Sequence, residues 1–214
     1  MHDVKEIAGR RAARMVDSGM TLGLGTGSTV HFFLEALAER IRAERLEVRG
    51  VPTSIETERK AREFGIPLAT LDQIERLDLT VDGADEIDTR FDMIKGGGGA
   101  LLREKVVASV TKHVVIISDS TKVVDRLGKF PLPVEVIPMA RSHVARQIAR
   151  RGGQPVWRDG VTTDNGNWIL DVHNLSIVDP VGLEREFNQI VGVVAVGLFA
   201  ARPADIVLCG NQTL

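Results

Sequence analysis

The segment from Val81 to Lys105 contains residue types that can do chemistry on a small polar molecule. It reads VDGADEIDTRFDMIKGGGGALLREK, so acids, a lysine, four consecutive glycines and a glutamate occur close together. The acids directly follow the apolar run Leu77–Val81, which predicts that they stand at the end of a strand, where side chains point into a crevice. Lys95 precedes Gly96–Gly99, whose backbone N–H groups can approach a ligand closely because glycine has no Cβ. The segment predicts a small-molecule site with acidic, basic and anion-holding groups.

Each of these features also has a plain structural interpretation. Glu86 and Asp88 are typical of surface acids that cap a turn, whereas the position of Asp82 and Asp85 at a strand end favours functional carboxylates. Four glycines cost more backbone entropy than a turn requires, which favours a ligand-contacting loop over a connector. From its position alone, Glu104 is interpreted as a solvated residue whose negative charge is favourable near the positive end of the helix dipole.

A second glycine-rich turn, Gly23–Thr29, reads GLGTGST. It is not a dinucleotide fingerprint, because Ser28 occupies the place of the third glycine, and no Gly-Lys-Ser/Thr follows for a P-loop. A strand, a glycine turn and hydroxyls that open a helix can still hold a phosphate, although Ser28 or Thr29 capping an ordinary helix is equally compatible. Lys122, at another predicted strand end, is either a phosphate or hydroxyl contact or a surface lysine, and Lys5 is a weaker candidate.

The sequence predicts no metal site. The acids between Asp82 and Asp88 do not fit an EF-hand, because Ile87 stands where the loop requires glycine. The five histidines and the single cysteine, Cys209, show no zinc-ligand spacing. A serine nucleophile elbow, G-x-S-x-G, is also missing from the sequence.

Composition is that of an ordinary globular protein, with 214 residues, 43% hydrophobic content and a net charge of −2. A negative net charge gives no electrostatic case for nucleic acid as a partner. No apolar run is long enough to span a bilayer, and the N-terminal residues lack the apolar core of a secretory signal peptide. One cysteine cannot form an intrachain disulfide, so we expect a cytoplasmic protein with no membrane partner.

Helical and strand patterns alternate through the first half of the chain. This order predicts an α/β fold with a mostly parallel, Rossmann-like sheet and helices on both faces. The predicted helices are residues 4–18, 29–42, 55–64 and 100–112, and the predicted strands are residues 21–24, 46–51, 77–81 and 113–118. The polar segments that leave these strands should meet at one rim of the sheet, where ligands bind in such folds.

Pro131 and Pro133 mark a change of pattern, because two close prolines disfavour both a helix and a central strand. Strands at 134–137, 155–158, 168–172 and 192–196, with helices at 141–151 and 183–189, then give the β-α-β-β-α-β order of a ferredoxin-like α+β domain. Asn165-Gly166 suits a hairpin turn, and strand 206–209 should return to the first sheet. We therefore expect a Rossmann-like catalytic domain, residues 1–130 and 198–214, and a ferredoxin-like small domain, residues 131–197.

The chain resembles the type A ribose-5-phosphate isomerases. The resemblance runs in order through six blocks that span nearly the whole chain: Gly25–Thr29, Asp82–Asp88, Ile94–Lys105, Leu127–Val136, Thr163–Asn167 and Gly192–Ala200. It implies interconversion of D-ribose 5-phosphate, a sugar-phosphate substrate, and D-ribulose 5-phosphate through an enediolate. It also implies that the protein uses no cofactor or metal and forms homodimers or homotetramers.

The resemblance assigns roles to individual positions. Glu104 corresponds to the catalytic base, Asp82 or Asp85 would shuttle protons on the sugar oxygens, and Lys95 with the glycine backbone would face the developing negative charge. The implied substrate-binding residues are Thr26, Gly27, Ser28, Thr29, Asp82, Gly83, Ala84, Asp85, Lys95, Gly96, Gly97, Gly98 and Lys122. For the phosphate we expect the loop Gly25–Thr29, assisted by Lys5 or Lys122; a phosphate seated on Lys95–Gly98 is the competing arrangement.

Two other functional classes stay open on the sequence. One is a sugar-phosphate-sensing module of the kind attached to DNA-binding domains, which the negative net charge disfavours. The other is a related enzyme on a similar fold, such as a sugar-phosphate deaminase or a coenzyme A transferase. The match across the whole chain weighs against both.

Overall fold

A computed structural model describes residues 2–214 and divides the chain into two compact units. Unit 1 comprises residues 1–83, 106–121 and 204–214, and unit 2 comprises residues 84–105 and 122–203. The predicted domains placed residues 84–105, 122–130 and 198–203 with the first sheet, whereas these segments pack in unit 2. They do so because residues 86–87, 93–94 and 198–199 pair in a small sheet of their own.

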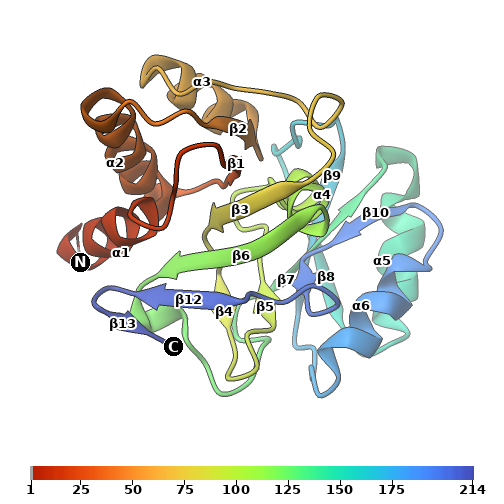
Figure 1. Ribbon diagram of the computed structural model, residues 1–214. Helices are drawn as coiled ribbons and strands as arrows, with labels where there is room; N and C mark the ends of the chain where they lie inside the picture. Colours follow the sequence, from red (N-terminus) through yellow and green to blue (C-terminus); the bar gives the residue numbers. More distant parts are fainter. Residues whose placement is uncertain (1) are drawn as a thin grey trace. The chain divides into compact units, whose positions relative to one another are not determined.

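Unit 1 is built on a six-stranded sheet with the order β13-β12-β6-β3-β1-β2 (Figure 1). All neighbours are parallel except β13, which pairs antiparallel with β12, so the predicted mostly parallel sheet is confirmed. Strand β12 returns to this sheet, as expected. The strands are β1 Thr21–Leu24, β2 Arg49–Pro52, β3 Leu77–Asp82, β6 Thr111–Ser118, β12 Ile206–Cys209 and β13 Gln212–Thr213.

Helices cover both faces of this sheet. Helices α1 (His2–Ala13), α2 (Ser28–Glu44) and α3 (Ile55–Glu63) bury their apolar residues, such as Phe33 and Leu37, with Leu22 and Leu24 of β1. Figure 1 shows α1 and α2 side by side. On the opposite face, Val107 near the end of helix α4 (Leu101–Ser109) approaches β1 so closely that a Cβ on Gly23 would lie 2.7 Å from its Cγ1 atom.

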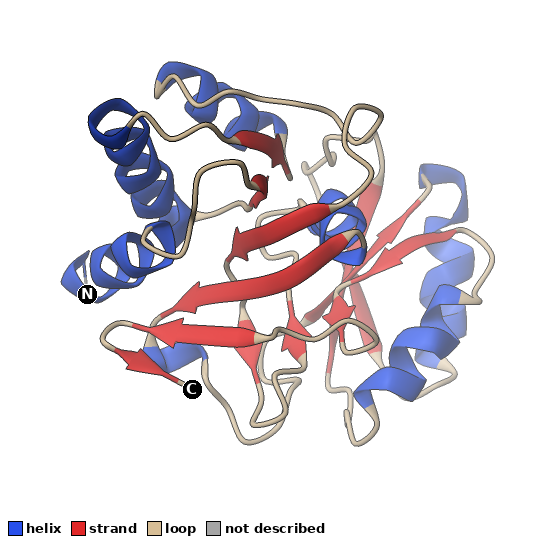
Figure 2. Cartoon of the chain, viewed as in Figure 1, coloured by secondary structure: helices blue, strands red, loops and turns tan. Residues whose placement is uncertain are grey.

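The main sheet of unit 2 is four-stranded and antiparallel, with the order β10-β7-β9-β8. Figure 2 distinguishes its strands from its two helices. Val134, Leu170, Val144 and Phe187 belong to the core that the strands and the helices share. The predicted ferredoxin-like pattern is confirmed, with elements β7 Leu132–Val136, η2 Pro138–Ala140, α5 Arg141–Ala149, β8 Gln154–Trp157, β9 Trp168–His173, α6 Pro180–Asn188 and β10 Val193–Val196.

One expectation about this sheet was wrong. Pro133 lies in β7, which is an inner strand between β10 and β9. The strand tolerates it because Pro133 is only its second residue and still uses its carbonyl oxygen, which accepts a hydrogen bond from Gly197 N at 2.7 Å. The predicted turn after Thr163 is present, with Gly166 at a φ of 80°.

A third sheet was not predicted. It joins β4 (Glu86–Ile87), β5 (Met93–Ile94) and β11 (Leu198–Phe199) in the order β11-β5-β4 within unit 2. Strands of two residues are too short to show an alternating pattern, so only their long-range pairing reveals them. This sheet matters for the site because Lys95 directly follows β5, and its backbone N–H donates to Gly197 O at 2.9 Å.

Among the described residues, no helix is both long and apolar enough to cross a membrane.

Candidate active site

A buried ion pair joins Lys95 and Glu104 in unit 2. Lys95 Nζ lies 3.1 Å from Glu104 Oε1, and the residues are 3% and 6% exposed. Strand β5 delivers Lys95, and the first turn of α4, closed by the hydrogen bond from Glu104 N to Ala100 O, delivers Glu104. The interpretation of Glu104 as a solvated helix residue is therefore wrong: its carboxylate points into the protein.

The loop between these two residues is a β-turn built from Gly96–Gly99, closed by a 3.0 Å hydrogen bond from Gly99 N to Gly96 O. Gly96 and Gly99 have φ values of 107° and 81°, which favour glycine. Gly97 N donates to Asp85 Oδ2 at 2.8 Å, and a Cβ on Gly97 would lie 2.7 Å from Asp85 Oδ1. The structure thus brings Asp85 to this turn, whose central residues Gly97 and Gly98 are exposed.

Sequence reasoning missed an arginine on the other side of this turn. Arg158, which follows β8, donates from Nη1 to Gly96 O at 3.0 Å and to Gly97 O at 3.1 Å. Its Nε and Nη2 atoms bind both carboxylate oxygens of Asp171 on β9, at 2.7 and 2.5 Å. No local pattern could have indicated this role, because Arg158 is about sixty residues from the glycines in the sequence.

A second ion pair, between half-buried Lys105 and buried Glu184, lies next to the first in unit 2. Lys105 binds Glu184 of α6 and donates to Leu198 O, and Glu184 accepts hydrogen bonds from Ala200 N and Ala201 N at 2.9 and 2.8 Å. The ring centroid of Phe199 lies 4.2 Å from Lys105 Nζ and 5.4 Å from Lys95 Nζ. Burial lowers the pKa of Lys105, and the charge of Glu184 partly offsets this effect.

In unit 1, Asp82 shapes the turn that follows β1. Its side chain is buried, and its Oδ1 atom accepts hydrogen bonds from Thr26 N at 3.0 Å and Gly83 N at 2.8 Å. The Thr26 hydroxyl lies 2.7 Å from that of Thr53 and donates to that of Ser54 at 2.9 Å. The carboxylate therefore holds the backbone at Thr26 in a defined position, while a cluster of hydroxyls holds its side chain.

The same turn leads into α2, whose first residue is Ser28. Gly27 is the N-cap residue, with a φ of 120°, and this helix start carries no side-chain cap. The interpretation of Ser28 or Thr29 as the cap is therefore wrong, and the backbone N–H groups of the first turn are left for another acceptor. Lys5 of α1 donates to Ser28 Oγ at 3.0 Å, which places an ammonium group at this helix start.

The remaining predicted residues stand at strand ends. Gly83 and Ala84 follow β3, and both are half-buried. Lys122 is the last residue of the short helix η1 (Ser120–Lys122) after β6, and it is also half-buried. Thr121 N donates to Asp119 Oδ1 at 3.0 Å, which shapes the turn before Lys122.

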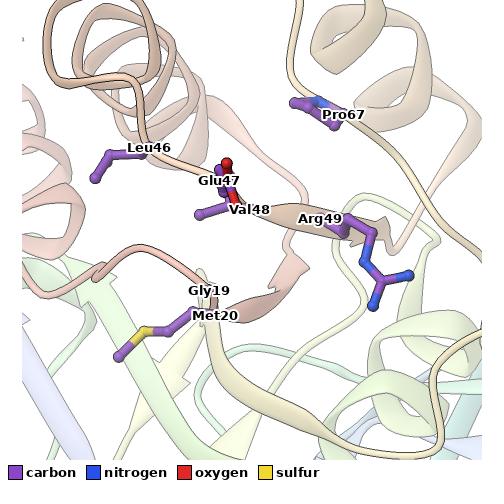
Figure 3. A pocket seen from close by; sticks show the side chains of 7 residues that line it. All are labelled: Gly19, Met20, Leu46, Glu47, Val48, Arg49 and Pro67. Atoms are coloured by element: carbon purple, nitrogen blue, oxygen red, sulfur yellow. The ribbon is translucent and has the colours of Figure 1, made fainter.

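A cavity of about 490 Å³ lies elsewhere in unit 1, where β1 and β2 begin (Figure 3). Its lining includes Met20, Glu47, Arg49 and Pro67, and none of the predicted site residues. Because the glycine turn of unit 1 follows the carboxyl end of β1, this cavity is at the opposite edge of the sheet from that turn. Across residues 2–214, no group of three or more histidine, cysteine, aspartate or glutamate residues is arranged to hold a metal ion.

Comparison with known proteins places the chain in a family. Residues 49–213 match the family described as ribose 5-phosphate isomerase A (phosphoriboisomerase A). The chain is 42% identical to ribose 5 phosphate isomerase A from Neisseria gonorrhoeae, with a TM-score of 0.96 and coverage of 100% of this chain and 97% of that one. The Methanocaldococcus jannaschii enzyme is 44% identical, with a TM-score of 0.96 and coverage of 100% and 98%.

A third solved structure is a D-ribose-5-phosphate isomerase in complex with phospho-erythronic acid. It is 38% identical, with a TM-score of 0.96 and coverage of 100% and 98%. Such likeness over complete chains, together with the family match over most of the sequence, leaves one assignment: the chain belongs to the ribose 5-phosphate isomerase A family.

Proposed function

We propose that this protein interconverts D-ribose 5-phosphate and D-ribulose 5-phosphate by proton transfer through an enediolate, with Glu104 as the base. The observation that carries the proposed mechanism is the buried Lys95–Glu104 pair, 3.1 Å apart, which flanks a glycine turn whose central residues are exposed. Isomerisation through an enediolate needs a base and a cation that lie close together. Family membership supports the same reaction and does not favour a sensor module, a deaminase or a coenzyme A transferase.

Aldose–ketose isomerisation requires one base that serves two carbons. The proton leaves C2 and returns to C1, so a single carboxylate that reaches both can remove it and deliver it. The ammonium group of Lys95 favours the ionised form of a neighbouring carboxylate, which is the form that accepts a proton. We assign this proton transfer to Glu104.

The negative charge that develops on the sugar oxygens needs fixed donors. An ammonium group and backbone N–H groups that are already oriented stabilise such charge more strongly than water does, because they need not reorganise during the reaction. Lys95 and the N–H groups of the glycine turn supply these donors in our proposal. Phospho-erythronic acid, the ligand of one related structure, carries a carboxylate that resembles the enediolate, and we expect it to compete with the substrate here.

Asp82 and Asp85 receive different roles. Asp85 is half-buried at the glycine turn, so it is suited to exchanging protons with the hydroxyl and ring oxygens of the sugar. Asp82 is buried and accepts hydrogen bonds from Thr26 N and Gly83 N. We therefore propose that Asp82 orients the turn at Thr26 and carries out any proton exchange with sugar oxygens at that turn.

We assign the phosphate group of the substrate to the start of α2. Unused N–H groups at a helix N-terminus, the positive end of the helix dipole and a nearby ammonium group form a favourable phosphate site. Ser28, Thr29 and Lys5 meet these conditions within unit 1. Lys122 stays a second candidate for a phosphate or hydroxyl contact. A homodimeric or homotetrameric state and a cytoplasmic location complete the proposal.

Solvent labelling separates this mechanism from a metal-assisted hydride shift. In D₂O, the enediolate mechanism predicts deuterium at the exchanging carbon of the product, and treatment with EDTA should leave the rate unchanged. Isomerisation without solvent deuterium, combined with a loss of rate in EDTA, would reject the mechanism. Tight binding of ribose 5-phosphate without any ribulose 5-phosphate would reject the activity.

A further inference from the structure

We infer that Arg158 is a positioning residue for the isomerase reaction, because it holds the glycine turn so that the N–H groups of Gly97 and Gly98 face the sugar. This inference rests on the proposed function and deepens it. It concerns a residue outside every motif that pointed to the site. The contacts that carry it all lie within unit 2.

The geometry of the peptide bond fixes the direction of two N–H groups in the turn. In a trans peptide, the C=O and N–H groups point in opposite directions. Arg158 Nη1 binds the carbonyl oxygens of Gly96 and Gly97 at 3.0 and 3.1 Å. The N–H groups of Gly97 and Gly98, which belong to the same two peptides, therefore point away from Arg158.

Asp85 lies on the side of the turn to which the Gly97 N–H group points. Gly97 N donates to Asp85 Oδ2 at 2.8 Å, which shows where the Gly97 N–H group is directed. The Gly98 N–H makes no hydrogen bond among residues 2–214 and is exposed, so it is available to an oxygen of the substrate. A Cβ built on Gly98 would meet no atom within 4 Å, so there is open space beside this residue.

Arg158 also restrains the glycine turn and polarises its peptide groups. Arg158 binds both carboxylate oxygens of Asp171, so its planar guanidinium group is fixed from two sides. A loop of four glycines has little conformational preference of its own, and this fixed cation supplies the missing restraint. A positive charge at the carbonyl end of a peptide also polarises it, which makes the N–H at the other end a stronger donor.

Three variants test this inference. Arg158→Met removes both carbonyl contacts, Arg158→Lys keeps the charge but not the planar fork, and Asp171→Asn weakens the support of Arg158. Arg151→Met is the matched control, because Arg151 pairs with the exposed Glu186 and touches no part of the turn. We expect kcat to fall about 10- to 100-fold in Arg158→Met, somewhat less than for the removal of a charge-stabilising donor. KM should change less than threefold.

The order of the variants carries the argument. Arg158→Lys should recover part of the lost kcat, Asp171→Asn should lose less than Arg158→Met, and Arg151→Met should match the wild type. Amide exchange at Gly99, whose N–H closes the turn, should be faster in Arg158→Met. If Arg158→Met fails to fold, Asp171→Asn and Arg158→Lys still have to show lowered kcat with faster exchange at Gly99.

Two results would overturn the inference. One is a wild-type kcat in Arg158→Met, and the other is a lowered kcat with unchanged exchange at Gly99. Failure of the proposed function looks different. In that case the wild-type protein is inactive on ribose 5-phosphate, or Glu104→Gln is as active as the wild type, whatever the Arg158 variants do.

Discussion

Lys95 Nζ lies 3.1 Å from Glu104 Oε1, and the two side chains are only 4% and 7% exposed. A buried ion pair of this kind is weak evidence for stability, because desolvation of the two charges opposes their attraction. Its presence at the two ends of a glycine turn therefore argues for a chemical role. Substitutions of the residues around the turn separate that role from a structural one.

Replacing Lys95 with methionine should remove charge stabilisation from the site. We expect kcat to fall about 100-fold or more, by analogy with the loss of an oxyanion donor. Lys95→Arg keeps the charge but presents a planar fork, so it should recover only part of the rate. Steady-state kinetics with thermal unfolding as a folding control test this, and a Lys95→Met protein with a kcat within threefold of the wild type would assign the pair to structure alone.

Alanine at Gly98 distinguishes a ligand-contacting loop from a connector. Its Cβ would meet no protein atom within 4 Å, and its φ is outside the positive range, so the Tm should stay within about 2 °C of the wild type. If the turn contacts the sugar, the added methyl group should nevertheless lower kcat/KM about tenfold or more, since a small misplacement in a site is costly. Wild-type kinetics in Gly98→Ala would make the turn a connector.

Gly97→Ala provides a useful companion. The new Cβ would lie 2.7 Å from Asp85 Oδ1, so the Asp85 side chain must move. We therefore expect a larger loss of kcat/KM in Gly97→Ala than in Gly98→Ala, accompanied by a lower Tm. The reverse order would mean that Asp85 takes no part in the reaction.

Lys5→Met tests the phosphate assignment at the start of α2. Lys5 Nζ donates to Ser28 Oγ at 3.0 Å, and an exposed lysine elsewhere, Lys129, serves as the matched control. Loss of a charge that binds substrate and transition state equally should raise KM, by roughly tenfold, with little change in kcat. If Lys5→Met leaves KM unchanged while Gly98→Ala raises it, the phosphate binds at Lys95–Gly98 instead.

The half-buried Lys105 gives a prediction about how stability depends on pH. Burial lowers its pKa from the ordinary value of 10.5 in the folded protein, with partial compensation by Glu184. Between the folded and the unfolded pKa, the unfolded chain binds more protons, so this group's contribution to stability increases with pH. Urea midpoints measured from pH 7 to 10 should therefore rise in the wild type relative to Lys105→Met, with Lys129→Met as control. A difference that stays constant or shrinks as the pH rises contradicts this.

Much of the fold could be predicted because it depends on local patterns. Short apolar runs located β1 and β12 at their observed bounds, and the patterns of the other long elements placed them within about five residues. The β-α-β-β-α-β order was also sufficient for the four-stranded sheet. The sheet of β4, β5 and β11 was not predictable, because pairs of two-residue strands are defined by contacts distant in sequence.

In the candidate site, too, the features with a local sequence pattern were predictable and those that depend on distant contacts were not. Acids at the end of β3 and four glycines were visible as chemical features, whereas Glu104 resembled a surface residue until the family resemblance indicated otherwise. Its burial against Lys95 depends on tertiary packing, which no local pattern encodes. Arg158 was missed entirely, because its partners are carbonyl oxygens of distant glycines and its role has no residue-type signature.

The most direct test of the account is the isomerisation of D-ribose 5-phosphate by Glu104→Gln, measured beside the wild type and the surface control Glu58→Gln. Glutamine keeps the shape of the side chain but cannot accept the proton, so kcat should fall at least about 1,000-fold, consistent with the loss of a general base. Glu58→Gln should match the wild type, and substrate binding to Glu104→Gln should persist. Turnover by Glu104→Gln within tenfold of the wild type would contradict the account.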